Sequence, residues 1–167
     1  GLHGINGSGK SPALMPTEIE GEIPSVGWLP ITVPGEISAW VALHKRFGSL
    51  PFALLFAHAI GYARNGFMLS RQTAMRIGTA RQRYKHCTAW CDTFLVDGRV
   101  PDIAERLYLP DHAETLESIA ASKGESFYRG ELADKIDAAS REEGGFIRKE
   151  DLHAHRCEWV EPISINV

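Results

Sequence analysis

The apolar positions between Gly27 and Ser70 recur at helical spacing and predict two consecutive amphipathic helices. Thr32 is placed to cap the first helix, which ends at Gly48, while Pro51 opens the second, which ends at Asn65-Gly66. The two apolar stripes consist of Ile37, Trp40, Val41, His44 and Phe47, and of Phe52, Leu55, Phe56, Ala59, Ile60 and Ala63. We expect the helices to lie antiparallel and to bury these stripes against each other.

The next part of the chain predicts one further helix and then an irregular stretch. Ser70 is a suitable cap for a helix that runs to about His86. Residues 87–110 show no sustained periodicity, and their short apolar run stops at the turn Asp97-Gly98. The charged residues of the helix are all basic, which would suit phosphates or RNA but is equally typical of a solvated helix surface.

The C-terminal third predicts shorter elements. Asp111 and Glu114 have the spacing of a capping box for a helix that closes at Lys123-Gly124. A second helix begins at Phe127-Tyr128 and stops at Gly144-Gly145, and a short helical turn covers 149–155. Residues 159–165 alternate like a strand, although Pro162 restricts them to a sheet edge. The chain is therefore predicted to be mainly α with little strand.

The composition is that of a folded protein without an obvious affinity for polyanions or lipid. The 167 residues are 44% hydrophobic and 23% charged, with a net charge of −3. No apolar run approaches the roughly 20 residues of a spanning helix, and no signal peptide is recognisable. We therefore expect neither nucleic acid nor a membrane as a partner, and both the cytoplasm and the periplasm remain open as compartments.

One motif near the N-terminus matches a nucleotide-binding signature. The run from Gly4 to Ser11, G-I-N-G-S-G-K-S, fits G-x-x-x-x-G-K-[ST], the loop whose backbone N–H groups cradle phosphates. That chemistry also needs a helix directly after the loop, yet Pro12 and then Pro16 follow. We interpret the run as a glycine-rich turn, and keep a P-loop nucleotide site as an alternative.

Other side chains of suitable chemistry lack a recognisable arrangement. Thiolates and imidazoles could bind zinc, but their spacing matches no compact zinc template; the candidates are His86, Cys87, Cys91, His153, His155 and Cys157. We expect the acids Asp134, Asp137, Glu142 and Glu143 to form a solvated helix face, and His44 and His58 to be structural. No metal ion and no cofactor are expected.

A series of short phrases spans nearly the whole chain in order. They are Gly27-Trp28-Leu29-Pro30, Val33-Pro34-Gly35, Ala39-Trp40, Phe47-Gly48, Leu50-Pro51-Phe52, Ala59-Ile60, Tyr62-Ala63, Gly66-Phe67, Leu116 to Ala120, Phe127-Tyr128-Arg129-Gly130-Glu131, Gly144-Gly145, Glu150-Asp151-Leu152 and Trp159-Val160-Glu161-Pro162. This series resembles the large-subunit region of the γ-glutamyltranspeptidases (γ-glutamyltransferases), and in particular a divergent, transpeptidase-like branch.

The resemblance implies an N-terminal-nucleophile (Ntn) hydrolase with an αββα fold, made as a precursor that cleaves itself into two subunits. The N-terminal Thr of the small subunit attacks a γ-glutamyl or related amide, because an α-amine beside a hydroxyl supplies base and nucleophile in one residue. This chain is expected to be a large-subunit fragment that lacks the Thr, contains no catalytic residue, needs the small subunit as its partner, and is inactive alone. Residues 1–26 are then a Gly/Pro-rich substrate-side loop, and residues 27–167 are the helical portion of a single, incomplete domain.

The resemblance also implies a substrate-binding position. In typical members an Arg four residues before a Pro holds the substrate carboxylate, and counting back from Pro12 gives Ser8. A Ser cannot make the bidentate contact of a guanidinium, so Lys10 is expected to offer a point charge instead. The expected substrate-binding residues are Asn6, Ser8 and Lys10. The alternative function from another class is a non-catalytic helical binding or interaction domain.

Overall fold

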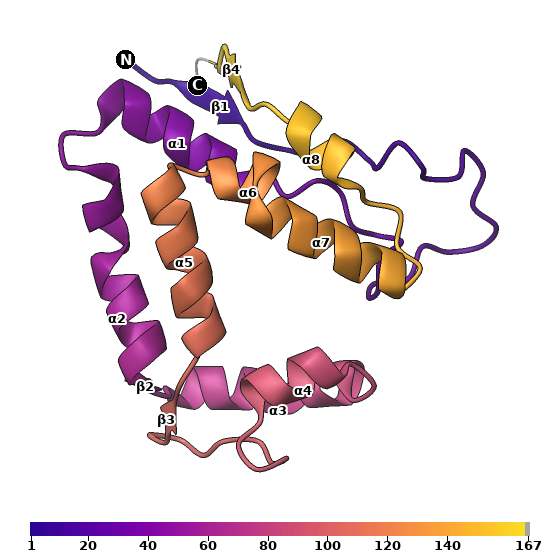
Figure 1. The fold of residues 1–167 in the computed structure, drawn as a ribbon, viewed down its shortest axis with the longest axis vertical. Coiled ribbons are helices and arrows are strands. Elements are labelled where there is room, and N and C mark those ends of the chain that lie inside the picture. Colours follow the sequence, from indigo (N-terminus) through magenta and orange to yellow (C-terminus); the bar gives the residue numbers. More distant parts are fainter. Residues whose placement is uncertain (166–167) are drawn as a thin grey trace. The chain divides into compact units, whose positions relative to one another are not determined.

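The N- and C-terminal segments of the chain meet in a small antiparallel sheet, in a computed structural model that describes residues 1–165 (Figure 1). Strand β1 (Gly4–Asn6) pairs with β4 (Glu158–Val160), and Ile5 lies opposite Trp159. Contacts divide the chain into two units. The first unit comprises Gly1–Leu54 with Ser118–Val167, and the second comprises Leu55–Glu117.

Several helices of the first unit contribute buried apolar side chains. These helices are α1 (Glu36–Phe47), α6 (Glu125–Arg129), α7 (Glu131–Glu142) and α8 (Lys149–Ala154). The core is formed mainly by Ile37, Tyr128, Leu132, Ala133, Ile147 and Leu152, all of which are buried. Burial of such side chains is the main source of stability, at about 25 cal/mol per Å² of apolar surface.

The predicted start of the first helix is wrong, whereas its end is confirmed. Helix α1 begins at Glu36, and Thr32 lies outside it; Gly35 precedes the helix without a side-chain cap. Gly48 follows its last residue and donates its N–H to the carbonyl of His44 at 2.7 Å. The stripe is buried only in part, because Ile37 is 8% exposed while Phe47 is 54% exposed.

The predicted second helix is divided, and its antiparallel pairing with the first helix stays a prediction. A 3-10 turn η1 (Phe52–Phe56) precedes helix α2 (Ala57–Asn65), which ends at Gly66 as predicted. Helix α1 belongs to the first unit, where Ile37 and Val41 lie against Gly124, whereas α2 belongs to the second. The spacing of apolar residues identified the helices, but it could not determine which surface covers each stripe.

The second unit is assembled around side chains from a short sheet and two helices. Strand β2 (Phe67–Met68) pairs antiparallel with β3 (Arg106–Leu107), next to α3 (Arg71–Tyr84) and α4 (Thr88–Phe94). Leu69, Ile77 and Leu107 form its buried cluster, against which Trp90 and Phe94 pack. The Ser70 cap of α3 is confirmed, since its side chain accepts the Thr73 N–H at 3.1 Å.

Two predictions in the second unit need correction, and one is confirmed. Residues 87–110 are not irregular throughout, because they contain α4 and β3. Helix α5 (Pro110–Ser122) already includes Asp111 in its first turn, so Asp111 is not the predicted cap. The turn at Asp97-Gly98 is confirmed, with φ of 51° and 75° between the paired residues Val96 and Arg99.

The described residues are mostly helical with a few short strands, as predicted. Helix α5 ends before Lys123-Gly124, α8 covers the predicted helical turn, and β4 is the start of the predicted edge strand. The helices from Phe127 to Gly144 are two, α6 and α7, separated at Gly130. No helix in residues 1–165 is long and apolar enough to cross a membrane.

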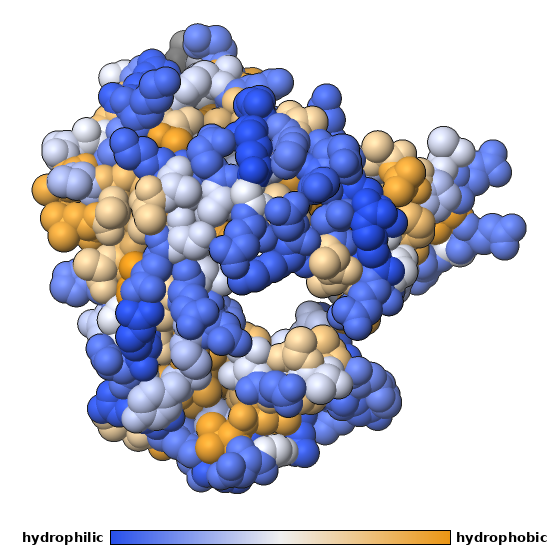
Figure 2. Space-filling view, in the orientation of Figure 1, coloured by the Kyte–Doolittle hydropathy of each residue, from blue (hydrophilic) through white to orange (hydrophobic). Residues whose placement is uncertain are grey.

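The surface is largely polar but carries apolar patches (Figure 2). Large apolar side chains that are at least half exposed include Phe47, Leu50, Leu54, Leu55, Tyr62 and Met75. Single exposed apolar residues are ordinary, whereas contiguous patches mark surfaces that contact other polypeptide.

Candidate functional site

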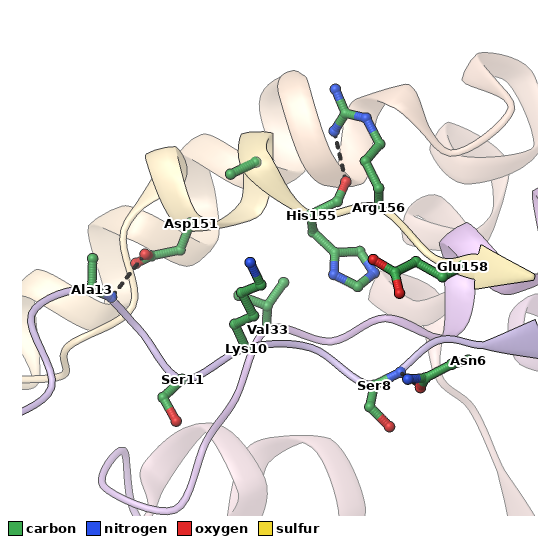
Figure 3. A pocket seen from close by; sticks show the side chains of 11 residues that line it. Asn6, Ser8, Lys10, Ser11, Ala13, Val33, Asp151, His155, Arg156 and Glu158 are labelled. Atoms are coloured by element: carbon green, nitrogen blue, oxygen red, sulfur yellow. Dashed lines mark hydrogen bonds between the residues drawn. The ribbon is translucent and has the colours of Figure 1, made fainter. Parts of the chain in front are cut away.

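A cavity of about 580 Å³ in the first unit brings together the three predicted substrate-binding residues. Asn6, at the end of β1, and Ser8 and Lys10, in the segment that follows, line it from one side (Figure 3). The opposite wall comes from α8 and the residues leading into β4, which contribute Asp151, His155, Arg156 and Glu158. The β1–β4 register fixes the two walls at one end, because Asn6 lies opposite Glu158.

Close backbone contacts hold the segment after β1 in place. The Val33 N–H donates to the carbonyl of Lys10 at 3.1 Å. A Cβ built on Gly9 would overlap the carbonyl of Val33, and one built on Gly35 would overlap the carbonyl of Gly7. Glycines at these positions are therefore explained by the close approach of two chain segments.

The same contacts account for the apparent nucleotide motif. Residues 11–35 contain no helix, so the helix that a phosphate-binding loop needs directly after Ser11 is missing. Gly4 is part of β1, where it lies opposite Val160, and Gly9 contacts Val33. The glycines of the motif thus have structural contacts that need no phosphate.

Asp151 joins the two walls of the cavity through both of its carboxylate oxygens. Its Oδ2 accepts the N–H of Arg148 at 2.8 Å and caps α8, while its Oδ1 accepts the N–H of Ala13 at 2.9 Å. Hydrogen bonds to a charged acceptor are among the stronger ones in proteins. Because both oxygens have backbone partners, Asp151 braces the cavity rather than offering a free carboxylate.

Among the described residues, Lys10 makes no direct ion pair in the cavity, which the carboxylates of Asp151 and Glu158 also line. Figure 3 shows its side chain extending toward Asp151 and His155, whereas the side chain of Ser8 points the other way. Within residues 1–165, no ion pair or hydrogen bond of its ammonium group is found. The Asn6 Oδ1 accepts the N–H of Ser8 at 2.9 Å, so this amide oxygen shapes the turn. Lys10 is the predicted residue best placed to meet an anionic group.

His155 is a buried residue of the site whose environment keeps it neutral. It is 8% exposed, and its ring stacks on Tyr128 with centroids 5.3 Å apart. Burial, with a smaller contribution from Arg129, lowers the pKa of His155 below its usual value. The sequence analysis considered His155 only as a zinc ligand. The sequence signal that could have pointed to this site was the position of His155 between the predicted helical turn and the predicted strand.

The pairing of His155 with Ser38 does not make a nucleophile. The His155 Nε2 lies 2.9 Å from the Ser38 Oγ, which in turn donates to the carbonyl of Gly35 at 2.7 Å. A serine whose proton is directed at a carbonyl is not deprotonated by the imidazole. The Tyr128 hydroxyl extends this network by donating to the Pro34 carbonyl at 2.8 Å and accepting the Ser38 N–H at 3.1 Å.

The other candidates from the sequence do not assemble into a reactive site. In the described part of the chain, no three His, Cys, Asp or Glu side chains are arranged to hold a metal ion. Cys157 donates to the Ser38 carbonyl at 3.4 Å, whereas Cys87 and Cys91 belong to the second unit. His44 is structural as predicted, with its Nε2 2.7 Å from the Leu50 carbonyl, but His58 is exposed.

Several acidic residues of α7 and of the position after it have polar partners. Asp137 pairs with Arg141 at 2.9 Å, and Asp134 pairs with Lys149 at 3.5 Å. Glu143 accepts the indole N–H of Trp28 at 2.8 Å. Arg141, the largest influence, holds the pKa of Asp137 below its usual range. The prediction of a solvated face is confirmed for Asp134, Glu142 and Glu143, which are exposed, but it is wrong for Asp137, whose side chain is only 13% exposed. The ion-paired acids leave no pair poised for acid–base work.

Comparison with known proteins identifies a family whose model matches nearly the whole chain. The family model described as Gamma-glutamyltranspeptidase matches residues 2–167. Glutathione hydrolase proenzyme 1 of Schizosaccharomyces pombe is 34% identical over 139 residues, which are 83% of this chain and 22% of that protein. Oxamate amidohydrolase proenzyme of Klebsiella pneumoniae is 32% identical over 140 residues, covering 81% of this chain and 26% of that protein.

A solved structure shows the same fold. The crystal structure of cephalosporin acylase from Bacillus halodurans superposes with a TM-score of 0.94 at 44% identity. The match covers 99% of this chain and 33% of the acylase chain. This chain therefore spans between about a fifth and a third of the length of these relatives.

Proposed function

The chain belongs to the γ-glutamyltranspeptidase family, and we propose that it is the substrate-side portion of the large subunit of an Ntn hydrolase. The family model covers residues 2–167, and the relatives named above are hydrolases or acylases, two of them proenzymes. The observation that carries the proposal is the cavity. Residues expected from family resemblance to bind substrate, Asn6, Ser8 and Lys10, line one space within the matched region.

In the proposed reaction the chemistry is performed by a residue outside this chain. The N-terminal Thr of a small subunit adds its hydroxyl oxygen to the amide carbonyl, while its own α-amine takes the hydroxyl proton. The C–N bond breaks, the amine leaves with that proton, and an acyl ester remains on the Thr. Water or an acceptor amine then attacks the ester and regenerates the Thr.

Lys10 is proposed to bind a carboxylate on the acyl part of the substrate. Its ammonium group has no partner in the described chain and extends into the cavity (Figure 3). A lysine contributes a point charge, whereas the guanidinium of typical members makes a planar, bidentate contact. Lys10 would therefore accept a carboxylate in more orientations than a guanidinium does. For this reason we propose γ-glutamyl and related amides as the substrate class, rather than one specific amide.

The backbone around Lys10 is proposed to serve as a rigid support. Asp151 ties Ala13 to α8, and Val33 binds the carbonyl of Lys10. Rigid placement matters because a charge displaced by about 1 Å can cost a hundredfold in rate. His155 is buried in the same wall, and its lowered pKa means that it adds no positive charge of its own at neutral pH.

The test begins with the complete gene product. Intact mass analysis should show two chains, with the second beginning at a Thr, and the protein should hydrolyse a γ-glutamyl or related amide. In that protein Lys10→Ala should raise KM about tenfold or more at nearly constant kcat, because the lost contact is made in both ground and transition states. Lys10→Arg should restore most of the affinity.

Lys135→Ala is the matched control, because Lys135 is an exposed lysine in the same unit, paired with Glu131 on α7. It should leave KM unchanged. An unchanged KM in Lys10→Ala would refute the carboxylate contact while leaving the family reaction intact. A single unprocessed chain without amidase activity would refute the reaction itself and favour a helical binding domain.

A further inference from the structure

A second cavity in the first unit is lined by basic side chains that the proposed reaction does not use. It has a volume of about 250 Å³ and lies among α1, α6 and the segment from His155 to Cys157. Lys45, Lys123, Arg129 and Arg156 contribute four positive charges to its lining, against one negative charge from Glu125.

The two arginines are held in place by backbone carbonyls at the C-terminal end of α8 and directly after it. Arg156 Nη1 donates to the carbonyls of His153 at 2.7 Å and His155 at 2.6 Å. Arg129 Nη2 donates to the His153 carbonyl at 3.2 Å, and its Nη1 lies 3.1 Å from the Glu125 carboxylate. Figure 3 shows the Arg156 side chain directed away from Lys10. The guanidiniums are therefore already ordered, which lowers the entropy cost of binding a ligand.

The two lysines add charge that the described chain does not neutralise. No ion pair of Lys45 or Lys123 is found within residues 1–165, and both side chains are exposed at the rim. Charges that share so small a space lie within about one Debye length, roughly 8 Å at physiological salt, and repel one another. The local excess of three positive charges also contrasts with the net charge of −3 for the whole chain. An anion would relieve this repulsion.

We propose that this cavity binds a small oxyanion of the phosphate class that carries at least two negative charges, such as pyrophosphate. The guanidinium N–H groups that bind neither a carbonyl nor Glu125 can donate to the oxygens of such a group, and lysine ammonium groups add point charges. The volume is below that of ordinary drug-sized sites, which run from about 300 Å³ upward. A singly charged carboxylate would leave most of the positive charge unbalanced.

The inference goes beyond the proposed amide reaction and does not depend on it. The two cavities nevertheless share the side chains of His155 and Arg156. Direct binding distinguishes the two proposals, because it is measured without substrate and without the small-subunit Thr taking part in chemistry.

The test is calorimetric titration of the complete gene product with sodium pyrophosphate at constant ionic strength and pH 7.5. Saturable binding at one site per chain is expected. The double variant K45A/K123A should weaken it about a hundredfold, since each charge-assisted contact is worth roughly tenfold. The charge-preserving variant K45R/K123R should stay within about threefold of the original protein. Phosphoserine, tested in parallel, shows whether a phosphate ester serves as well as the inorganic anion.

The matched control is Lys85→Ala, which removes an exposed lysine from the second unit and should leave binding unchanged. Three outcomes would overturn the proposal: no saturable binding up to millimolar pyrophosphate, equal binding by K45A/K123A and the original protein, or an equal loss in Lys85→Ala. Circular dichroism of the double variant verifies folding, and single variants K45A and K123A replace it if it unfolds.

Discussion

In the first unit, polar groups join segments that are far apart in the chain, whereas the second unit is assembled around apolar side chains from neighbouring elements. Ala13 reaches Asp151 across 138 positions, and Trp28 reaches Glu143 across 115. In the second unit Leu69, Ile77 and Leu107 form the centre, with ion pairs such as Arg99–Glu105 at the surface.

The difference shows that polar contacts can position a site within a unit that also has an apolar core. An apolar cluster tolerates small shifts, because dispersion and burial depend little on direction. Hydrogen bonds between backbone and carboxylate fix both distance and angle. The unit that contains the two cavities is the one in which directional contacts between distant segments position the chain, in addition to the burial of apolar side chains.

The largest expected effect is at the backbone crossing in the first unit. Gly35→Ala places a Cβ against the carbonyl of Gly7 and close to the His155 ring, so the segments must separate. We expect a loss of about 4 kcal/mol or more in the free energy of unfolding, measured by urea denaturation. The control is Gly61→Ala on α2, where a Cβ meets nothing within 4 Å. It should be neutral or stabilising by up to about 1 kcal/mol. Equal effects of the two variants would contradict the account of the crossing.

The next effect is expected in the apolar cluster of the second unit. Leu107→Ala removes a side chain that is 4% exposed and should cost about 3 kcal/mol through lost burial and the cavity that remains. Met75→Ala on α3, where Met75 is 58% exposed, should change stability by less than about 0.5 kcal/mol. Hydrogen exchange of peptides from residues 55–117 should show the loss of stability as reduced protection in Leu107→Ala. Equal protection in Leu107→Ala and Met75→Ala would argue against this cluster as the core of the second unit.

A smaller effect is expected when one polar brace of the first unit is removed. Tyr128→Phe keeps the ring but leaves the Pro34 carbonyl and the Ser38 N–H without this partner. The cost should be about 2 kcal/mol, the penalty for unsatisfied buried polar groups. Phe127→Leu, a change in the neighbouring half-buried ring, is the comparison for packing alone. If Tyr128→Phe were as stable as the original protein, the hydrogen bonds would not be what joins α6 to the start of α1.

The smallest expected effect is a difference between the two units in how their stability depends on pH. A depressed His pKa means that the unfolded chain takes up a proton first, so stability falls as pH drops below about 6.5, the ordinary value for His155. Hydrogen bonding from Arg99 lowers the pKa of Glu105 from 4.5 to about 2, so its contribution is lost only between those values. Hydrogen exchange, corrected for intrinsic rates, should show the first unit losing protection at a higher pH than the second. His155→Gln should reduce the pH dependence of hydrogen-exchange protection in the first unit. An unchanged pH dependence would show that other titratable groups cause it.

Much of the secondary structure followed from local signals. Ser70, Gly48, Lys123-Gly124 and Asp97-Gly98 are positions where one residue determines a cap or a turn, and all were predicted correctly. Helix α4 was missed because its seven residues are too few for an apolar period to be visible. Thr32 failed as a cap because close contacts around Val33 and Gly35 determine where α1 begins.

The cavity was only partly predictable. Family resemblance indicated the segment with Ser8 and Lys10, and the fold brings both into one cavity. The opposite wall could not be read from the sequence, because Asp151 and His155 reach the segment only through tertiary pairing. The glycines also matched a phosphate-binding motif, which was kept as an alternative to a glycine-rich turn. The same spacing of glycines can arise whether a ligand or another backbone segment lies against them.

The pairing of β1 with β4 also has a consequence for the order in which this chain folds. Gly4 cannot find Val160 until nearly all of the intervening residues have been synthesised. At roughly 5 to 20 residues per second, the first strand waits on the order of ten seconds for its partner. Helices such as α3 close only local contacts and can form during that interval, because contacts that are distant in sequence form slowly. The wall that carries Lys10 is therefore completed last within this chain, and its exposed strand edge is the part most in need of protection at the ribosome.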